Sequence, residues 1–297
     1  VGMQGIAVAE RAYQKAVSYA KDRVQSRDLA GSAGPVAIIH HPDVRRMLMS
    51  MRAQTEAARA LSYVTAAAFD AGHHHADEAT RKSNAAFYDF MVPIVKGWST
   101  ELSIEVASTG VQVHGGMGFI EETGAAQYYR DARILTIYEG TTAIQANDLV
   151  GRKTLRDGGA LARSIIAQIR QTEAELASAK SPDLQAIGQR LLAATIALEK
   201  VVDYIAATGK SDIKAVFAGS VPYLKLAGIV FGGWQMARAA LIASSKAEAG
   251  EGDVAFYRAK LGTARFFADH FLSQADASRI AIVEGSAGVL ALSEEQF

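Results

Sequence analysis

A lone carboxylate directly before a helix start is the clearest chemical signal in this sequence. Glu139 lies in the segment 135–145, LTIYEGTTAIQ, where an apolar approach is followed by a glycine and two threonines. Thr141 or Thr142 can cap the following helix by accepting hydrogen bonds from its first free N–H groups. Backbone donors and the positive end of the helix dipole then gather beside Glu139. This arrangement suits a general base held in one orientation, although most carboxylates at such positions only cap a helix.

A second candidate site is the glycine-rich segment 111–119, VQVHGGMGF. Glycines such as Gly115 and Gly116 let the backbone approach phosphate oxygens closely. The spacing is not G-x-G-x-x-G and no strand is predicted before it, which argues against a dinucleotide site of the Rossmann type. By themselves, these glycines predict no more than a tight turn.

Three motifs in this order resemble the C-terminal helical domain of the acyl-CoA dehydrogenases. They are the segments 111–119, 129–133 (YRDAR) and 137–141 (IYEGT). In that family, the Glu of the last motif removes the α-proton of an acyl-CoA thioester while a hydride leaves the β-carbon for FAD. The resemblance implies that Glu139 is the catalytic base and that Glu139 and Gly140 contact the substrate.

The α-proton of a thioester is weakly acidic, so its base works best when it is poorly solvated. We expect the apolar neighbours Ile137 and Tyr138 to raise the pKa of the Glu139 carboxyl. Hydrogen bonds to the thioester carbonyl stabilise the enolate-like charge as the proton leaves. The family uses the backbone N–H of the base and a ribose hydroxyl of the flavin as these donors.

The resemblance also implies an FAD site shared between two subunits. Gln112, Gly115 and Gly116 match positions that contact the pyrophosphate and adenosine of the neighbouring subunit's FAD. Arg23 matches an arginine that reaches the same pyrophosphate, and a guanidinium suits phosphate through its paired donors. Thr141 matches a threonine that contacts the cofactor. We therefore expect a homodimer or a dimer of dimers.

Some positions depart from the family pattern. Residues 24–27, VQSR, replace the aromatic–glycine stretch that many members have after the arginine, and the usual glutamine is replaced around His41. Ala143 replaces a polar residue that is common there. Flavin contacts at these positions must differ in detail.

Two other functions share this fold. An acyl-CoA oxidase uses the same base and passes electrons to oxygen, whereas a dehydrogenase passes them to an acceptor such as electron-transfer flavoprotein. A catalytically inactive helical assembly module would keep the fold without the chemistry. The retained glutamate, double glycine and arginine favour the dehydrogenase.

Composition excludes several functions. Lys+Arg and Asp+Glu both total 31 in 297 residues, which argues against a nucleic-acid binder with a broad basic surface. There is no Cys, so no disulfide, thiolate nucleophile or Cys-ligated metal is possible. That agrees with a reducing compartment, and we expect a cytoplasmic location.

Three consecutive histidines, 73–75, cannot converge on one ion from regular structure, so we expect no metal site.

Helical periodicity dominates the elements that must position these residues, so the fold class is all-α. We expect long helices at about residues 5–24, 42–71 and 77–110, the last kinked or interrupted at Pro93. A short helix near residues 125–130 precedes the catalytic loop, and another helix runs from there to about residue 155. Together they predict a four-helix-bundle-type domain over residues 1–157.

The segment 157–159, DGG, marks a predicted boundary, and residues 158–297 form a second helical domain. That region resembles the C-terminal extension of a subset of acyl-CoA dehydrogenases, including those acting on methylmercaptopropionyl-CoA. The apolar segment 221–242 is interrupted by Lys225, Gln235 and Arg238, so we expect a buried helix and no membrane span.

The family's N-terminal helical domain and middle β-domain have no counterpart here. Because those domains supply much of the flavin and acyl-CoA site, we expect the chain alone to be inactive.

Overall fold

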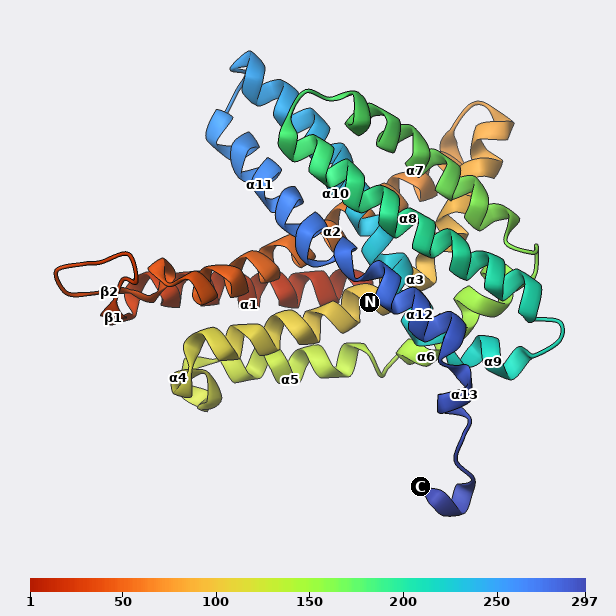
Figure 1. The fold of residues 1–297 in the computed structure, drawn as a ribbon, viewed down its shortest axis with the longest axis horizontal. Helices are drawn as coiled ribbons and strands as arrows, with labels where there is room; N and C mark the ends of the chain where they lie inside the picture. Colours follow the sequence, from red (N-terminus) through yellow and green to blue (C-terminus); the bar gives the residue numbers. More distant parts are fainter.

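The computed structural model describes all residues, 1–297, and confirms the all-α prediction (Figure 1). Its first half consists of α1 (Gly2–Asp22), β1 (Val24–Arg27), β2 (Pro35–Ala37), the 3-10 helix η1 (Ile38–His40), α2 (Pro42–His74), α3 (Glu78–His114), α4 (Gly116–Phe119), the 3-10 helix η2 (Glu121–Thr123), α5 (Ala125–Leu135), α6 (Thr142–Asp148) and the π-helix η3 (Leu149–Leu155). The second half consists of α7 (Ala160–Ser178), α8 (Pro182–Thr208), α9 (Ile213–Ala218), α10 (Ser220–Ala249), α11 (Val254–His270), η4 (Leu272–Gln274), α12 (Ala275–Glu284), α13 (Ser286–Val289) and η5 (Glu294–Gln296).

Helix α3 is the central helix of the first half, where it packs against α1, α2 and α5. Small residues bring α1 onto it, because a Cβ on Gly2 or Gly5 would lie 2.8 Å from the Val95 carbonyl oxygen or 2.5 Å from that of Ser99. This backbone contact fixes the start of α1 beside residues 95–99 of α3. The Glu139 loop rests on the same part of α3, through a hydrogen bond from Lys96 to the Tyr138 carbonyl.

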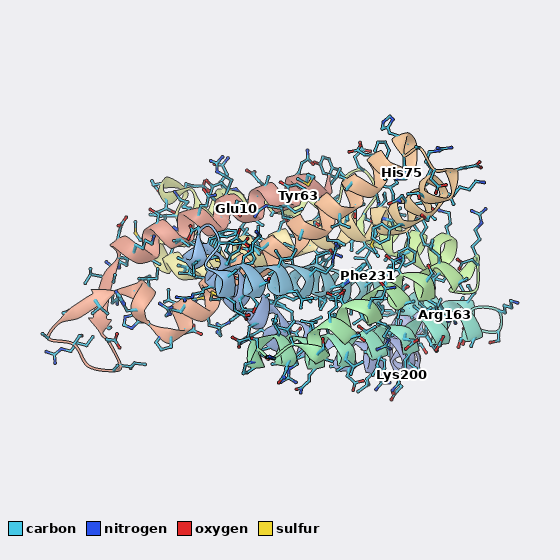
Figure 2. All side chains as sticks on the ribbon, turned by 90° about the horizontal axis from the view of Figure 1, so that it is seen from above. Glu10, Tyr63, His75, Arg163, Lys200 and Phe231 are labelled. Carbon is cyan, nitrogen blue, oxygen red and sulfur yellow. The ribbon has the colours of Figure 1, made fainter.

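Helix α10 is the central helix of the second half and packs against α2, α3, α6, α8, α11 and α12. Trp98 of α3 fits against Gly228 and Gly232, where a Cβ would lie 2.2 and 2.5 Å from the indole. Figure 2 shows Phe231 of α10 between the layer that carries Glu10 and Tyr63 and the layer that carries Arg163 and Lys200. One core of 58 buried residues therefore runs through both halves. The division at residue 157 stays a prediction.

Length and composition alone would let α10 cross a membrane, and it is the single helix of this structure that meets that test. Its most apolar window is 78% buried inside the protein. Helix α10 is thus a core helix here, as the interrupted apolar run predicted.

The structure corrects several predicted boundaries in the first half. Residues 24–37 contain an antiparallel pair of strands, β1 and β2, whereas we had predicted no strand. Every β1 side chain is exposed, so the strand has no alternation to detect. Gly72 does not end α2, which continues to His74; a Cβ on Gly72 would lie 3.2 Å from the Ala85 backbone nitrogen, so glycine serves close packing on α3.

Helix α3 runs from Glu78 to His114 without a break at Pro93, and the kink that we predicted as the alternative stays a prediction. Gly116 and Gly118 lie in the short helix α4 and not in a loop. The helix predicted from Glu139 to about residue 155 is present, as α6 followed directly by the π-helix η3, and α5 packs beside α1 and α3. The Thr154 hydroxyl donates to the Leu149 carbonyl within η3 (2.8 Å), which gives that wider turn a side-chain partner.

Candidate functional site

The Glu139 loop leaves α5 and returns to α6 through two residues of left-handed backbone. Glu139 has φ +53° and Gly140 has φ +87°. Thr142 N–H donates to the Thr136 carbonyl (3.1 Å) and closes the loop, while Thr141 caps α6 by accepting from Ile144 N–H (3.4 Å). The predicted cap is therefore confirmed and belongs to Thr141. A left-handed conformation costs a residue other than glycine about 1–2 kcal/mol, so other contacts have to hold Glu139.

A buried lysine of α3 supplies those contacts. The Nζ of Lys96 donates to the Tyr138 carbonyl (3.1 Å) and also to the Gly140 carbonyl, which are the carbonyls on either side of Glu139. Lys96 is 9% exposed, and no carboxylate lies within ion-pair distance of it. Burial lowers the pKa of Lys96, and the charges of Glu139 and Glu101 oppose that shift. Hydrogen bonds from a charged donor contribute about 1.5–3 kcal/mol each, which is enough to offset the backbone strain.

Two further side-chain bonds anchor the loop. The Thr142 hydroxyl donates to Glu101 of α3, and the Tyr138 hydroxyl donates to Gln4 of α1. The loop is therefore held by both helices that cross beneath it. Sequence reasoning missed Lys96, Glu101 and Gln4; the signal for Lys96 was a lysine inside the apolar run 90–98, FMVPIVKGW.

The Glu139 carboxylate itself is exposed in this chain. Its neighbour Ile137 is 46% exposed and Tyr138 is half-buried, so these residues do not shield the carboxylate from water. The desolvation of the Glu139 carboxylate that we expected from Ile137 and Tyr138 is therefore not observed in this chain.

The predicted cofactor residues Arg23, Gln112, Gly115 and Gly116 all line one pocket of about 360 Å³. The Arg23 guanidinium donates to Gln25 (3.1 Å) and has no carboxylate partner. Thr141 is not part of this pocket. It lies beyond the opposite end of α5, beside Glu139 and Gly140.

The backbone at Gly115 and Gly116 is open, so a ligand group could approach it from solvent. A Cβ on Gly115 or Gly116 would have no atom within 4 Å, and Gly115 has φ +60°. Gly118 differs, because a Cβ there would lie 2.3 Å from the Val111 carbonyl oxygen. Open backbone, a guanidinium and an amide form a donor set suited to the phosphate oxygens of a dinucleotide such as FAD.

His114 and Tyr19 complete this pocket and had no assigned role in our predictions. Their rings stack with centroids 4.4 Å apart, and His114 is 4% exposed. Its Nδ1 lies 2.7 Å from the Gly110 carbonyl, which can only accept, so Nδ1 carries the proton. Burial lowers the pKa of His114, while the bond to Gly110 opposes that shift. The imidazole is therefore neutral near pH 7.

The two predicted sites lie far apart on the same chain. Helix α3 carries Lys96 near one site and Gln112 at the other, a separation of 16 residues and about 24 Å along the helix axis. Helix α5 runs between them, with α4 near one end and α6 near the other (Figure 1). One compact ligand cannot touch both sites of a single chain.

No group of three His, Cys, Asp or Glu side chains in residues 1–297 is arranged to hold a metal ion. His73 and His74 end α2, and the His73 imidazole bonds to the Phe69 carbonyl (2.7 Å).

Family comparison places the chain in a known class. The profile described as "Acyl-CoA dehydrogenase, C-terminal domain" matches residues 1–153, and the profile "Acetyl-CoA dehydrogenase C-terminal like" matches residues 165–293. The chain belongs to the acyl-CoA dehydrogenase family.

Two members of the family share substantial sequence identity with this chain. The chain is 51% identical to the 3-methylmercaptopropionyl-CoA dehydrogenase of Ruegeria pomeroyi, over 99% of this chain and 50% of that protein. It is 35% identical to a broad-specificity linear acyl-CoA dehydrogenase of Mycobacterium tuberculosis, over 100% of this chain and 50% of that protein. The chain thus spans about half the length of these curated relatives.

A solved structure agrees with the fold. The acyl-CoA dehydrogenase of Bacillus anthracis, complexed with FAD, superposes with a TM-score of 0.71 at 19% sequence identity. The match covers 99% of this chain and 49% of that one.

Proposed function

We propose that this chain is part of an FAD-dependent acyl-CoA dehydrogenase in which Glu139 removes the substrate α-proton. The observation that carries the proposal is the Glu139 loop, where a strained glutamate is held between two carbonyls bound by one buried lysine. Strained backbone of this kind is concentrated at functional sites, because it costs free energy and persists only where surrounding contacts enforce it. Family membership supports the same assignment.

Each group of the loop then has a chemical task. Glu139 takes the α-proton of the thioester, and the exposed position of its carboxylate leaves room for the acyl group. The backbone N–H of Glu139, which has no partner within the chain, donates to the thioester carbonyl and stabilises the developing charge. FAD, when bound, accepts the hydride that leaves the β-carbon.

We propose further that the pocket around Arg23 and Gln112 binds the FAD of a second copy of this chain. The separation of about 24 Å between Lys96 and Gln112 supports this, because the two sites then serve two different cofactors. A homo-oligomer follows as a requirement for activity, with electron-transfer flavoprotein as a suitable acceptor for the electrons.

The substrate is proposed to be an acyl-CoA thioester, and the likeness to the Ruegeria pomeroyi enzyme makes 3-methylmercaptopropionyl-CoA the first compound to test. The experiment is an anaerobic titration of the full-length, FAD-loaded protein with that thioester and with straight-chain acyl-CoAs, following flavin bleaching. Glu139→Gln should slow bleaching by about 10²–10⁴-fold, the usual contribution of a general base.

Glu175→Gln is the matched control, since it makes the same change at an exposed glutamate of α7. It should bleach at the wild-type rate. Wild-type bleaching by Glu139→Gln would refute the base assignment, and the absence of bleaching by any thioester in FAD-loaded wild-type protein would refute the proposed activity. Oxygen consumption with peroxide formation in air would identify an oxidase instead.

A further inference from the structure

Lys96 is a buried charge for which the fold gives no ordinary explanation. Lysine is almost never buried unless it is paired with a carboxylate, and Lys96 has no such partner. Its ammonium is instead bound by the carbonyls of Tyr138 and Gly140. A position in the core could be filled by an apolar residue at lower cost, so the lysine is required by the loop that it binds.

The bond to Tyr138 also fixes the direction of a neighbouring donor. No peptide bond in the chain is cis, so the Tyr138 carbonyl and the Glu139 N–H point in opposite directions across one peptide plane. Because Lys96 draws this carbonyl toward α3, the Glu139 N–H is turned away from α3. The same argument applies to the Gly140 carbonyl and the N–H of Thr141.

The remaining contacts show that this direction is not set by the backbone alone. Neither Glu139 N–H nor Thr141 N–H has a backbone acceptor in the chain. The bond between Thr142 and Thr136 closes the loop but binds neither the Tyr138–Glu139 peptide nor the Gly140–Thr141 peptide. Lys96 is the group that binds both of these peptides.

We propose that Lys96 is a positioning residue that fixes the Glu139 carboxylate and aims the Glu139 N–H at the carbonyl of the bound thioester. This inference rests on the proposed role of Glu139 as the base. Lys96 itself does not touch the substrate, because the residue is only 9% exposed and its ammonium donates to the Tyr138 and Gly140 carbonyls of the loop. It acts on the rate of proton removal and not on acyl-CoA affinity.

The test uses the full-length, FAD-loaded enzyme and compares Lys96→Met, Lys96→Arg and Glu139→Gln. Lys96→Met should slow anaerobic flavin reduction by about 10–100-fold and change the acyl-CoA dissociation constant by less than about threefold. Lys96→Arg keeps a charged donor and should recover the rate to within about threefold of wild type. Lys225→Met is the control, since Lys225 is an exposed lysine that also contacts α3, through Glu105 (2.8 Å).

A spectroscopic signature separates positioning from a general loss of structure. The carbonyl stretch of a bound ¹³C=O thioester moves to lower frequency when the carbonyl accepts hydrogen bonds. Lys96→Met should lose part of that shift, whereas Glu139→Gln should retain it, because that variant keeps the backbone N–H. The double variant should be no slower than Glu139→Gln alone, since both changes act on one step.

The outcomes are distinct. Lys96→Met at the wild-type rate, with Glu139→Gln inactive, would overturn the role of Lys96 and leave the base assignment standing. Glu139→Gln at the wild-type rate would overturn the base assignment and this inference with it. Should Lys96→Met not retain FAD, Lys96→Arg decides: an FAD-loaded Lys96→Arg protein with a normal carbonyl shift and near-normal rate supports the inference, and a loss of more than about tenfold overturns it.

Discussion

The Glu139 loop and the Gly115 pocket are built in opposite ways, although α3 carries part of both. The loop is bound by three side chains of α1 and α3, Lys96, Glu101 and Gln4, and holds a residue with strained backbone. The pocket at the other end has open glycines, an arginine without a carboxylate partner and few internal bonds.

The difference fits the two tasks proposed for these regions, a base and a surface for a neighbour's cofactor. A base must keep one orientation relative to a reacting atom, so its contacts are made within the chain before substrate arrives. A surface for a neighbour's cofactor receives its contacts from outside, so its donors remain available and its backbone stays uncovered. The predictions below alter one region at a time and ask whether this division holds.

The largest effect is expected within the glycine segment itself. Gly118→Ala should destabilise the protein by about 3 kcal/mol, because its Cβ would lie 2.3 Å from a backbone oxygen that has little room to move. Gly116→Ala should leave stability unchanged, since nothing in the chain lies within 4 Å of its Cβ. It should reduce FAD retention, because the added methyl group would occupy space in the proposed FAD pocket. Denaturant unfolding and flavin content measure the two effects. Equal stability of the two variants would contradict the separation of a packed and an open glycine.

Arg23→Met should weaken FAD retention by about 10–100-fold, or about 1.4–2.8 kcal/mol, with little change in the unfolding of the flavin-free protein. The lost group is a guanidinium with free donors toward the pocket. Arg27→Met, an exposed arginine on β1, is the matched control and should retain FAD normally. Flavin fluorescence during dialysis follows both. Identical losses in the two variants would mean that net charge, and not the pocket, holds the cofactor.

Glu139→Gly should stabilise the protein by about 1 kcal/mol while abolishing turnover. Glycine removes the cost of φ +53°, less its own larger entropy loss on folding. Glu139→Ala retains the Cβ and should lose turnover without the gain in stability. Urea unfolding compares the three proteins. A less stable Glu139→Gly protein would show that the glutamate side chain contributes more to the fold than its strain costs.

The smallest effect concerns His114, whose pKa burial holds below its ordinary value of 6.5. The unfolded chain therefore binds this proton first as the pH falls, so stability should decrease below about pH 6.5, by at most about 1.4 kcal/mol at pH 5.5. His114→Phe keeps a ring beside Tyr19 and should remove that share of the pH dependence. Unfolding midpoints at pH 7.5 and 5.5 provide the measurement. An unchanged pH dependence would mean that His114 is not protonated on unfolding in this range.

Sequence reasoning proposed Glu139 and the glycine pair as site residues because each lies in a short motif whose chemistry is local. It also predicted a cap at Thr141 or Thr142 and the starts of the long helices, which depend on neighbouring residues. It missed Lys96, which lies 43 residues before Glu139 in the sequence and meets the loop only through the packing of α3. The hairpin of β1 and β2 was missed because its side chains are exposed, and the π-helix because one extra residue per turn leaves no distinct pattern.

The separation of the two sites along α3 has a consequence for how mutations combine. If each active centre takes its base from one subunit and its FAD-binding arginine from the other, a Glu139→Gln chain and an Arg23→Met chain damage different halves of every centre. A mixed dimer of the two then contains one centre with both defects and one with neither. Two inactive variants expressed together would restore about a quarter of the activity when subunits associate at random, so the effect of one variant would depend on the variant with which it is paired.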